Sequence, residues 1–145
     1  MSTFPHSYRL SAILAEGGLV RMTTDEGALL ECAAPANFGG EPGGQSPESL
    51  LTEAVASCFM LSFVAIARAS GFEWNALSCE VEGILDKADR ALKFTAFNVV
   101  AELEVRDAEA CRRGEMLLQK AENTCLVSNS LACPVNIRTK VVAGD

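Results

Sequence analysis

The sequence predicts an α+β fold with the element order βββ-α-ββ-α-β, and three patterns support this prediction. Segments whose apolar residues alternate, as in half-buried strands, occur in the opening third, in the middle and at the end of the chain. Two longer segments repeat apolar residues every three or four positions, which predicts helices. Strands and helices grouped in this way are typical of the α+β class. Because no repeat or linker divides the 145 residues, we expect a single domain over residues 1–145.

The opening third predicts a small antiparallel meander. Its three expected strands are SYRLSAILA (7–15), LVRMTT (19–24) and ALLECAA (28–34). Glycine-containing turns separate the strands, as is usual in hairpins. In the first strand, Tyr8, Leu10, Ala12 and Leu14 fall on one face, and this period of two predicts a strand.

A loop and a long helix follow. The segment 35–46 is rich in glycine and proline, and loops of this length are often functional. Ser46 as N-cap, Pro47 at the first position and Glu48 in the first turn predict the start of a helix, which we expect to end at Gly71. Its second half, within AVASCFMLSFVAIA, is apolar on every side, so we expect a central buried helix covered by protein.

The remaining elements are a hairpin, a helix and a strand. Alternation over 77–85 and 91–105 predicts the hairpin, with a phase slip near Thr95 that indicates a bulge. A helix is expected from Asp107 to Cys125, with Cys125 on its buried stripe. Alternation over 135–141 predicts the last strand. The long helix should therefore pack against an antiparallel sheet.

Composition limits the function classes. With 49% hydrophobic residues the chain is not expected to be disordered. A net charge of -7 argues against binding to nucleic acid or to an anionic membrane surface. The N-terminus shows no secretory signal, and the apolar run of about 14 residues is shorter than the roughly 20 that span a bilayer. We therefore expect a soluble cytoplasmic protein.

The chain has six cysteines and one histidine, without a CxxC pair or zinc-ligand spacing. We expect no metal site and no resident cofactor, and in a reducing compartment the thiols should be free. Cys58 and Cys125 differ from the others because both lie on helices that need burial. If these helices pack together, the two sulfurs can approach bonding distance. A buried cysteine also often only fills space, so a structural role for Cys58 is the competing interpretation.

Two segments resemble the cysteine motifs of the OsmC/Ohr family of thiol-dependent peroxidases. SPESLLTEAVASCFMLSF resembles the first motif, with Pro-Glu, a leucine-rich turn and then Ala-x-x-Cys-Phe. AENTCLVSNSL, followed by a strand, resembles the second. The predicted element order and the chain length also match, so the resemblance covers nearly the whole sequence and implies an OsmC-like fold.

The resemblance implies a role for several residues. Cys58 matches the peroxidatic cysteine, whose thiolate attacks a hydroperoxide, releases an alcohol and becomes a sulfenic acid. Cys125 matches the resolving cysteine, which condenses with the sulfenic acid to a disulfide. Glu48 matches a glutamate that orients an arginine, although it also suits a helix first turn on its own. An external thiol, dihydrolipoyl in the Ohr branch, is the implied reductant. The family also forms an intertwined homodimer with its sites at the interface.

The sequence departs from the family pattern at two places. The first turn reads Gly17-Gly18-Leu19, without the usual following arginine, so Arg21 is the candidate replacement on the same strand face. Leu126 stands where a proline is usual, and Cys133, which precedes a proline, is a rival resolving residue. Without a nearby cation, burial should raise the pKa of the Cys58 thiol.

These departures keep other functions open. One alternative is a divergent paralogue with weak or no peroxidase activity that binds a small apolar ligand. Another is a structural dimer module without a site. The other cysteines (Cys32, Cys79 and Cys111) and the apolar residues beside Cys58 (Phe59, Met60 and Phe63) are interpreted as core.

Overall fold

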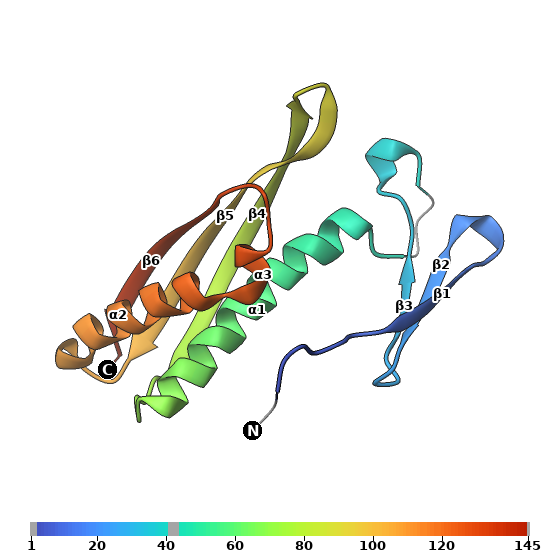
Figure 1. The fold of residues 1–145 in the computed structure, drawn as a ribbon. Coiled ribbons are helices and arrows are strands. Elements are labelled where there is room, and N and C mark those ends of the chain that lie inside the picture. The colour runs from blue at the N-terminus through green and yellow to red at the C-terminus, as the bar shows by residue number, and fades with distance from the viewer. Residues whose placement is uncertain (1–2, 41–43, 145) are drawn as a thin grey trace. The chain divides into compact units, whose positions relative to one another are not determined.

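The computed structural model describes residues 3–40 and 44–144, and it confirms the predicted α+β fold and order of elements. The chain divides into two compact units, Met1–Leu50 and Leu51–Asp145. Helix α1 (Pro47–Ala69) begins in the first unit and continues through the second (Figure 1). Ser46 caps it, since the Ser49 N–H donates to the Ser46 Oγ at 3.1 Å. Because helix α1 belongs to both units, this division is compatible with one domain and with two. The single domain over residues 1–145 stays a prediction.

The first unit is a three-stranded antiparallel sheet in the order β1-β2-β3. Its strands are β1 (Leu10–Leu14), β2 (Val20–Thr24) and β3 (Leu29–Cys32). A 3-10 turn, η1 (Glu16–Gly18), connects the first two. The register places Leu14 opposite Val20 and Val20 opposite Cys32, so these apolar residues share one face. The predicted antiparallel meander is thus confirmed.

The predicted loop 35–46 begins with a second 3-10 turn, η2 (Ala36–Phe38). It ends where Gln45 accepts a backbone hydrogen bond from Ala33 at 2.9 Å, which ties the loop to the end of β3. Residues 41–43 of this predicted loop lie outside the described residues.

The second unit contains the sheet β4-β5-β6, with α1 and α2 on one of its faces (Figure 1). The bounds are β4 (Ala76–Ala88), β5 (Ala91–Val105), α2 (Ala108–Thr124), α3 (Leu126–Asn129) and β6 (Val135–Ala143). A two-residue turn joins β4 to β5 with positive φ at Asp89 (52°) and Arg90 (66°), as a type I′ hairpin requires. The predicted bulge is confirmed, because Ile84 pairs with Ala96 and Leu85 with Phe94, leaving Thr95 unpaired.

The sheet of the second unit is mixed and not purely antiparallel. β6 pairs with β5 in parallel, whereas β4 pairs with β5 antiparallel. Helices α2 and α3 lie between β5 and β6 in the chain and return it to the starting end of β5, which permits parallel pairing. Strand alternation alone does not encode strand direction.

A single hydrophobic core lies between this sheet and its helices. Val55, Phe59, Phe63 and Ala67 of α1 are buried there together with alternate residues of β5 and the stripe of α2. Gly114 lets α2 approach β5, because a Cβ at this position would lie 2.9 Å from the Leu103 Cδ2. The predicted buried stripe of α2 is confirmed at Gly114, Leu117, Leu118, Ala121 and Cys125, with Cys111 only half-buried.

In the single chain, α1 is covered on one side only. Leu61 is 66% exposed, and Ser57 and Ala65 are also exposed. By length and composition α1 could cross a membrane, yet its buried stripe packs into the core as in the central helix of a soluble fold. The expected cover on every side of α1 is therefore incomplete in one copy of the chain.

Candidate active site

Cys58 lies in the middle of α1, at the edge of the stripe that faces the core. Its neighbour Phe59 is buried, and each helical residue turns about 100° from the last. Cys58 is consequently half-buried beside the core. This placement gives the thiol an apolar surrounding without sealing it from small molecules.

Cys125 lies directly after α2 and is 1% exposed. Its backbone leaves the helical conformation (φ -65°, ψ 107°), while its N–H still donates to the Glu122 carbonyl at 3.3 Å. The chain then turns into α3 (Leu126–Asn129). The end of α2 thus turns the Cys125 side chain into the core next to α1.

The structure brings Cys58 and Cys125 together in the second unit. The Cys125 thiol lies close enough to the Cys58 thiol to disfavour its ionisation, and all six cysteines are free thiols. The backbone N–H of Val127 and the hydroxyl of Ser62 also lie near the Cys58 thiol. The neighbours that affect its ionisation are therefore one thiol and two neutral polar groups.

The pKa of the Cys58 thiol is raised above its usual value, and burial is the largest cause. The contact with Cys125 also raises this pKa, because a second ionisable thiol disfavours a thiolate beside it. The donors Val127 and Ser62 act in the opposite direction, since they stabilise the negative charge. At neutral pH the Cys58 thiol is accordingly mostly protonated.

The other cysteines occupy different positions. Cys133, the rival resolving residue, is half-buried just before β6, and the thiol that contacts Cys58 is Cys125. Cys79 lies in β4 on the core face, where burial raises the pKa of its thiol. Cys111 packs at the edge of the core, and Cys32 is buried in the first unit. The interpretation of the latter three as core residues agrees with these surroundings.

Glu48 lines an apolar cavity of about 250 Å³ within the first unit. The lining comprises Gly18, Val20, Cys32, Ala33, Ala34, Pro35, Phe38, Pro47 and Glu48. The half-buried carboxylate thus lies at the start of α1 against a hydrophobic wall. Glu48 and Cys58 are ten residues apart on this helix, or about 15 Å along its axis at 1.5 Å per residue. The two side chains of one chain do not meet along α1.

Arg21 lies on the opposite face of the first sheet. Its neighbours Val20 and Cys32 line the Glu48 cavity, whereas Arg21 pairs across the strands with Glu31. The Arg21 Nε lies 3.0 Å from the Glu31 Oε2, and both side chains are about half exposed. The partner recorded for Arg21 is Glu31, and the predicted pairing of Arg21 with Glu48 stays a prediction.

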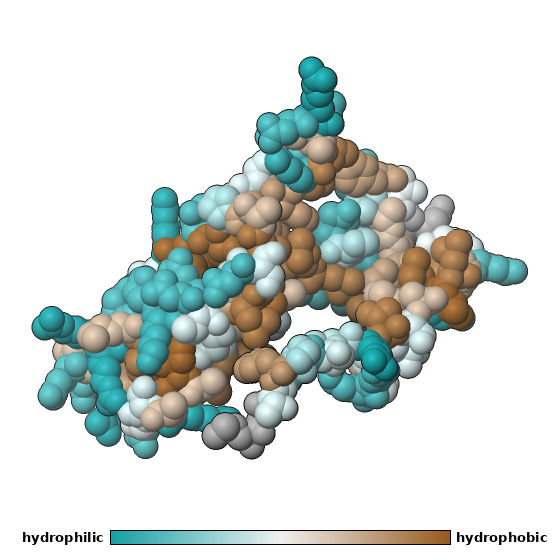
Figure 2. Space-filling model, viewed as in Figure 1, coloured by the Kyte–Doolittle hydropathy of each residue, from teal (hydrophilic) through white to brown (hydrophobic). Residues whose placement is uncertain are grey.

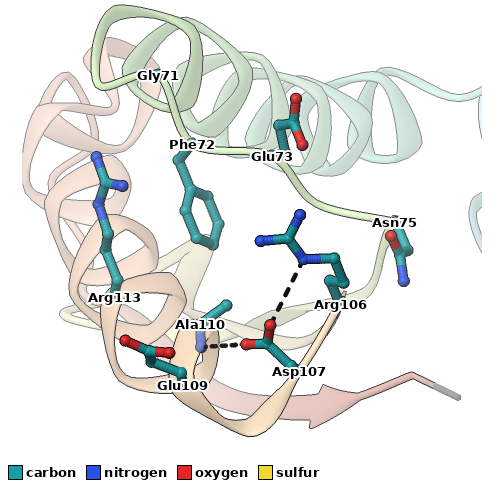
Figure 3. Close-up of a pocket in the computed structure, with 9 residues that line it drawn as sticks. All are labelled: Gly71, Phe72, Glu73, Asn75, Arg106, Asp107, Glu109, Ala110 and Arg113. Carbon is teal, nitrogen blue, oxygen red and sulfur yellow. Dashed lines mark hydrogen bonds and ion pairs between the residues drawn. The ribbon is translucent and has the colours of Figure 1, made fainter.

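A larger hollow of about 430 Å³ lies at the start of α2 and contains no cysteine (Figure 3). Arg106 lies 3.5 Å from Asp107, and Asp107 caps α2 by accepting from the Ala110 N–H at 3.0 Å. Arg113 lies over the Phe72 ring, 5.5 Å from its centroid. Arg106, Asp107 and Arg113 thus each have a partner within the chain. We interpret these residues as structural groups that hold the start of α2 in place.

Sequence reasoning missed two members of the cysteine site. Ser62 follows Cys58 by four residues on α1, so its position on the same face of the helix could have been predicted from the spacing. The nearness of Val127 to Cys58 could not be predicted, because it depends on the geometry of the turn between α2 and α3. In the part of the chain that the structure describes, no group of three or more His, Cys, Asp or Glu side chains could hold a metal ion.

Comparison with known proteins gives consistent matches. The family model "OsmC-like protein" matches residues 39–140. The uncharacterized protein YmaD of Bacillus subtilis is 24% identical over 121 residues, covering 80% of each chain. Because YmaD is uncharacterized, this match indicates no function.

An organic hydroperoxide resistance protein OsmC from Legionella pneumophila superposes with a TM-score of 0.75 at 23% identity, covering 97% of this chain and 99% of that one. An OsmC-like protein from Mycoplasma pneumoniae gives 0.79 at 18% identity, covering 96% and 99%. OhrB of Bacillus subtilis gives 0.67 at 20% identity, covering 94% and 98%. These likenesses confirm the fold, and with the match of the family model they show that the chain belongs to the OsmC-like family.

Proposed function

We propose that the protein reduces organic hydroperoxides to alcohols by thiol chemistry, with Cys58 as the attacking residue and Cys125 as the resolving one. The observation that carries this proposal is the contact between the two thiols inside an OsmC-like fold. Organic hydroperoxide resistance proteins with the same fold are consistent with a peroxide-related redox role.

The chemistry proceeds in two steps. The Cys58 thiolate attacks one oxygen of the hydroperoxide, so that an S–O bond forms and the O–O bond breaks. The other oxygen leaves with a proton as the alcohol, and Cys58 becomes a sulfenic acid. The Cys125 sulfur then attacks the Cys58 sulfur, water leaves, and a disulfide forms. A dithiol reductant, such as a dihydrolipoyl group, returns both cysteines to thiols and is itself oxidised to a disulfide.

Burial favours organic over inorganic hydroperoxides in this proposal. Cys58 packs against the hydrophobic core of the second unit, so a substrate with an apolar substituent gains contacts that hydrogen peroxide lacks. The same surroundings hold Cys125 next to Cys58, which makes formation of the disulfide local. No large rearrangement of α2 is needed to bring the sulfurs together.

The active unit is proposed to be a homodimer located in the cytoplasm. Glu48 is about 15 Å along α1 from Cys58, so a glutamate that serves this thiol is better supplied by α1 of a second copy. The uncovered side of α1, with Leu61 66% exposed, is the surface available for such a copy. Sites formed by two chains follow from this arrangement.

The test uses cumene hydroperoxide and the reduced protein, with disulfides mapped by mass spectrometry. The expected result is a Cys58–Cys125 disulfide, and peroxide consumption that is lost in Cys58→Ser. Cys79→Ser is the matched control, because it removes a half-buried thiol outside the pair and should keep the activity. Six unchanged thiols at a modest excess of peroxide would refute the peroxidase proposal. A Cys58–Cys133 disulfide would instead replace Cys125 as the resolving residue.

The second candidate function is binding of a small apolar ligand by a weak peroxidase. Two observations favour it: the raised pKa of Cys58, and the apolar cavity beside Glu48. The expected result is that a fluorescent fatty acid binds equally well to wild type and Cys58→Ser, and poorly to Phe38→Glu, which places a charge in the cavity wall. Equal binding by Phe38→Glu would exclude this cavity as the ligand site.

A further inference from the structure

The outer face of the second sheet points away from α1 and α2 (Figure 1) and contains a hollow of about 380 Å³ over β5 and β6. Asn98, Val99, Val100, Asn136 and Arg138 line this hollow. In both strands, exposed residues alternate with residues that pack in the core, so all of these side chains except Val99 project from the outer face. The hollow therefore lies on the opposite side of the sheet from the Cys58 and Cys125 thiols.

The parallel register of β5 and β6 brings the polar groups of the hollow together. Asn98 is opposite Asn136, and Val100 is opposite Arg138. Neighbouring strands lie about 4.8 Å apart, and residues two positions apart on one strand are separated by about 6.6 Å, so these four residues form a compact rectangle. The Asn136 Nδ2 donates to the Asn98 Oδ1 at 3.1 Å, which leaves the Asn98 Nδ2 as a donor. An amide donor, a guanidinium and an exposed valine thus share one hollow.

Two observations distinguish this hollow from an ordinary solvated sheet face. Asparagine is depleted in strands, yet two asparagines are paired here, and residues that oppose local propensity are expected mainly at functional or strained sites. Among the described residues, the Arg138 side chain forms no ion pair, whereas Lys140 on the same face of β6 lies 3.9 Å from Glu102. The Arg138 guanidinium is therefore available to an anionic ligand.

We propose that this hollow is a binding site for a small monocarboxylic acid with an apolar chain. The planar guanidinium of Arg138 matches a carboxylate and binds its charge, and the Asn98 Nδ2 donates to the same group. The apolar chain lies on Val100, which is 52% exposed and gains cover from it. The volume of about 380 Å³ is at the lower end for ligand pockets, which suits a small molecule.

The neighbouring strand β4 limits the charge that the site accepts. Glu80 is opposite Val100 and Glu82 is opposite Asn98, and both acids are exposed on the same outer face. These carboxylates repel a ligand with two negative charges, such as phosphate, more strongly than a ligand with one. A singly charged carboxylate is consequently favoured over phosphate.

The test follows the amide NMR spectrum of the isotope-labelled full chain during titration with sodium hexanoate. The expected result is saturable shifts confined to β5 and β6, including the Asn98 side-chain amide and the backbone N–H groups of Val100 and Arg138. Sodium acetate, which lacks most of the apolar chain, should bind about tenfold more weakly. Shifts that do not saturate, or that spread over the whole protein, would overturn the inference. Phosphate that binds as tightly as hexanoate would overturn the assignment to a monocarboxylate.

A pair of variants separates the site from general attraction of an anion to positive charge. Arg138→Gln keeps a polar side chain without the charge, and hexanoate should bind about tenfold more weakly because charge-assisted hydrogen bonds are lost. Lys140→Gln is the matched control, since it removes a cation from the same face of β6 that already pairs with Glu102, and the affinity should stay within about twofold of wild type. Both residues are exposed, so both variants should fold, which circular dichroism checks.

Two outcomes with these variants would contradict the site. Unchanged affinity in Arg138→Gln would show that the guanidinium does not bind the carboxylate. Equal losses in Arg138→Gln and Lys140→Gln would show only that the anion follows the net charge of the protein. None of these measurements involves a thiol, so the result does not depend on the peroxidase proposal.

Discussion

The two units of the chain differ in how they treat their apolar residues. The second unit buries a continuous core between its sheet and helices, with Phe63, Phe97 and Leu118 inaccessible to solvent. The first unit buries only Cys32 and Ala33 among its described residues. Leu10 and Leu14, on the apolar face of the first sheet, are 56% and 77% exposed. Figure 2 shows hydrophobic residues at the surface of the first unit as well as along the second.

The second unit therefore buries its own apolar residues, whereas the first unit leaves an apolar sheet face exposed to solvent. A bare apolar face keeps hydrophobic surface in contact with water, which is unfavourable, and exposed apolar patches on soluble proteins usually mark interaction sites. The uncovered side of α1 poses the same requirement in the second unit. In the proposed homodimer, a second copy of the chain would cover both apolar surfaces with its own.

The largest effect is expected from breaking the core of the second unit. Phe97→Ala removes a fully buried ring from β5 and should lower the free energy of unfolding by about 3–5 kcal/mol. Urea denaturation followed by circular dichroism measures it. Val100→Ala on the outer face of the same strand is the control, since Val100 is 52% exposed and should cost below about 1 kcal/mol. Equal losses would contradict the assignment of the core.

The next effect concerns the apolar face of the first unit. Leu10→Asp places a charge on this face and should weaken self-association about a hundredfold, as for an interface hot spot. Sedimentation velocity over a range of concentrations measures it. Ser11→Asp adds the same charge on the opposite face of β1 and should leave association unchanged. If Leu10→Asp has no effect, this sheet face is not part of the proposed dimer interface.

A third effect concerns pH, because the pKa of Cys58 is raised, mainly by burial. Below that pKa the thiolate fraction, and with it the alkylation rate, should increase about tenfold per pH unit. A thiol activated by an arginine would instead reach its plateau near neutral pH. An alkylation plateau below pH 8 in wild type would therefore refute the raised pKa.

The same shift is linked to stability. The folded-state pKa of Cys58 lies above the unfolded one, so the stabilisation is fully present below the unfolded pKa. It is lost as pH rises through the folded-state pKa. Midpoints of urea unfolding measured from pH 7 to 10 should accordingly decrease at the alkaline end.

Most of the fold could be predicted from periodicity. The helix starts at Ser46 and Asp107 could be predicted, because N-cap preference depends on the side chain at that position. Both capping hydrogen bonds are present in the structure. The bulge at Thr95 was readable because an extra residue shifts the alternation. The parallel pairing of β6 was not, because strand direction depends on how the intervening helices return the chain. The bare side of α1 could be anticipated, because its second half is apolar on every side and one sheet with one other helix covers only part of it.

The candidate site was predictable only in part. The nearness of Cys58 and Cys125 could be anticipated because both cysteines lie on the packing faces of helices. The surroundings of the sulfur could not, because the Val127 N–H arrives through a turn whose geometry has no sequence signature. The partner of Arg21 was also unreadable, since Glu31 becomes its neighbour only through the register of β2 and β3.

The smallest effect is expected at Arg21, and it tests whether the first unit activates the thiol of the second. Arg21 forms an exposed ion pair with Glu31, so Arg21→Ala should cost at most about 1 kcal/mol of unfolding free energy. If the ion pair is its whole role, Cys58 alkylation at neutral pH should stay within about twofold of wild type, because a twofold change in thiolate fraction is only about 0.3 pKa units. Glu31→Ala is the matched control, since it breaks the same pair and leaves the arginine free. A tenfold slower reaction in Arg21→Ala but not in Glu31→Ala would show that Arg21 replaces the missing arginine after Gly18. Thiolate formation would then depend on both units, and the neutral donors at Cys58 would be only part of its activation.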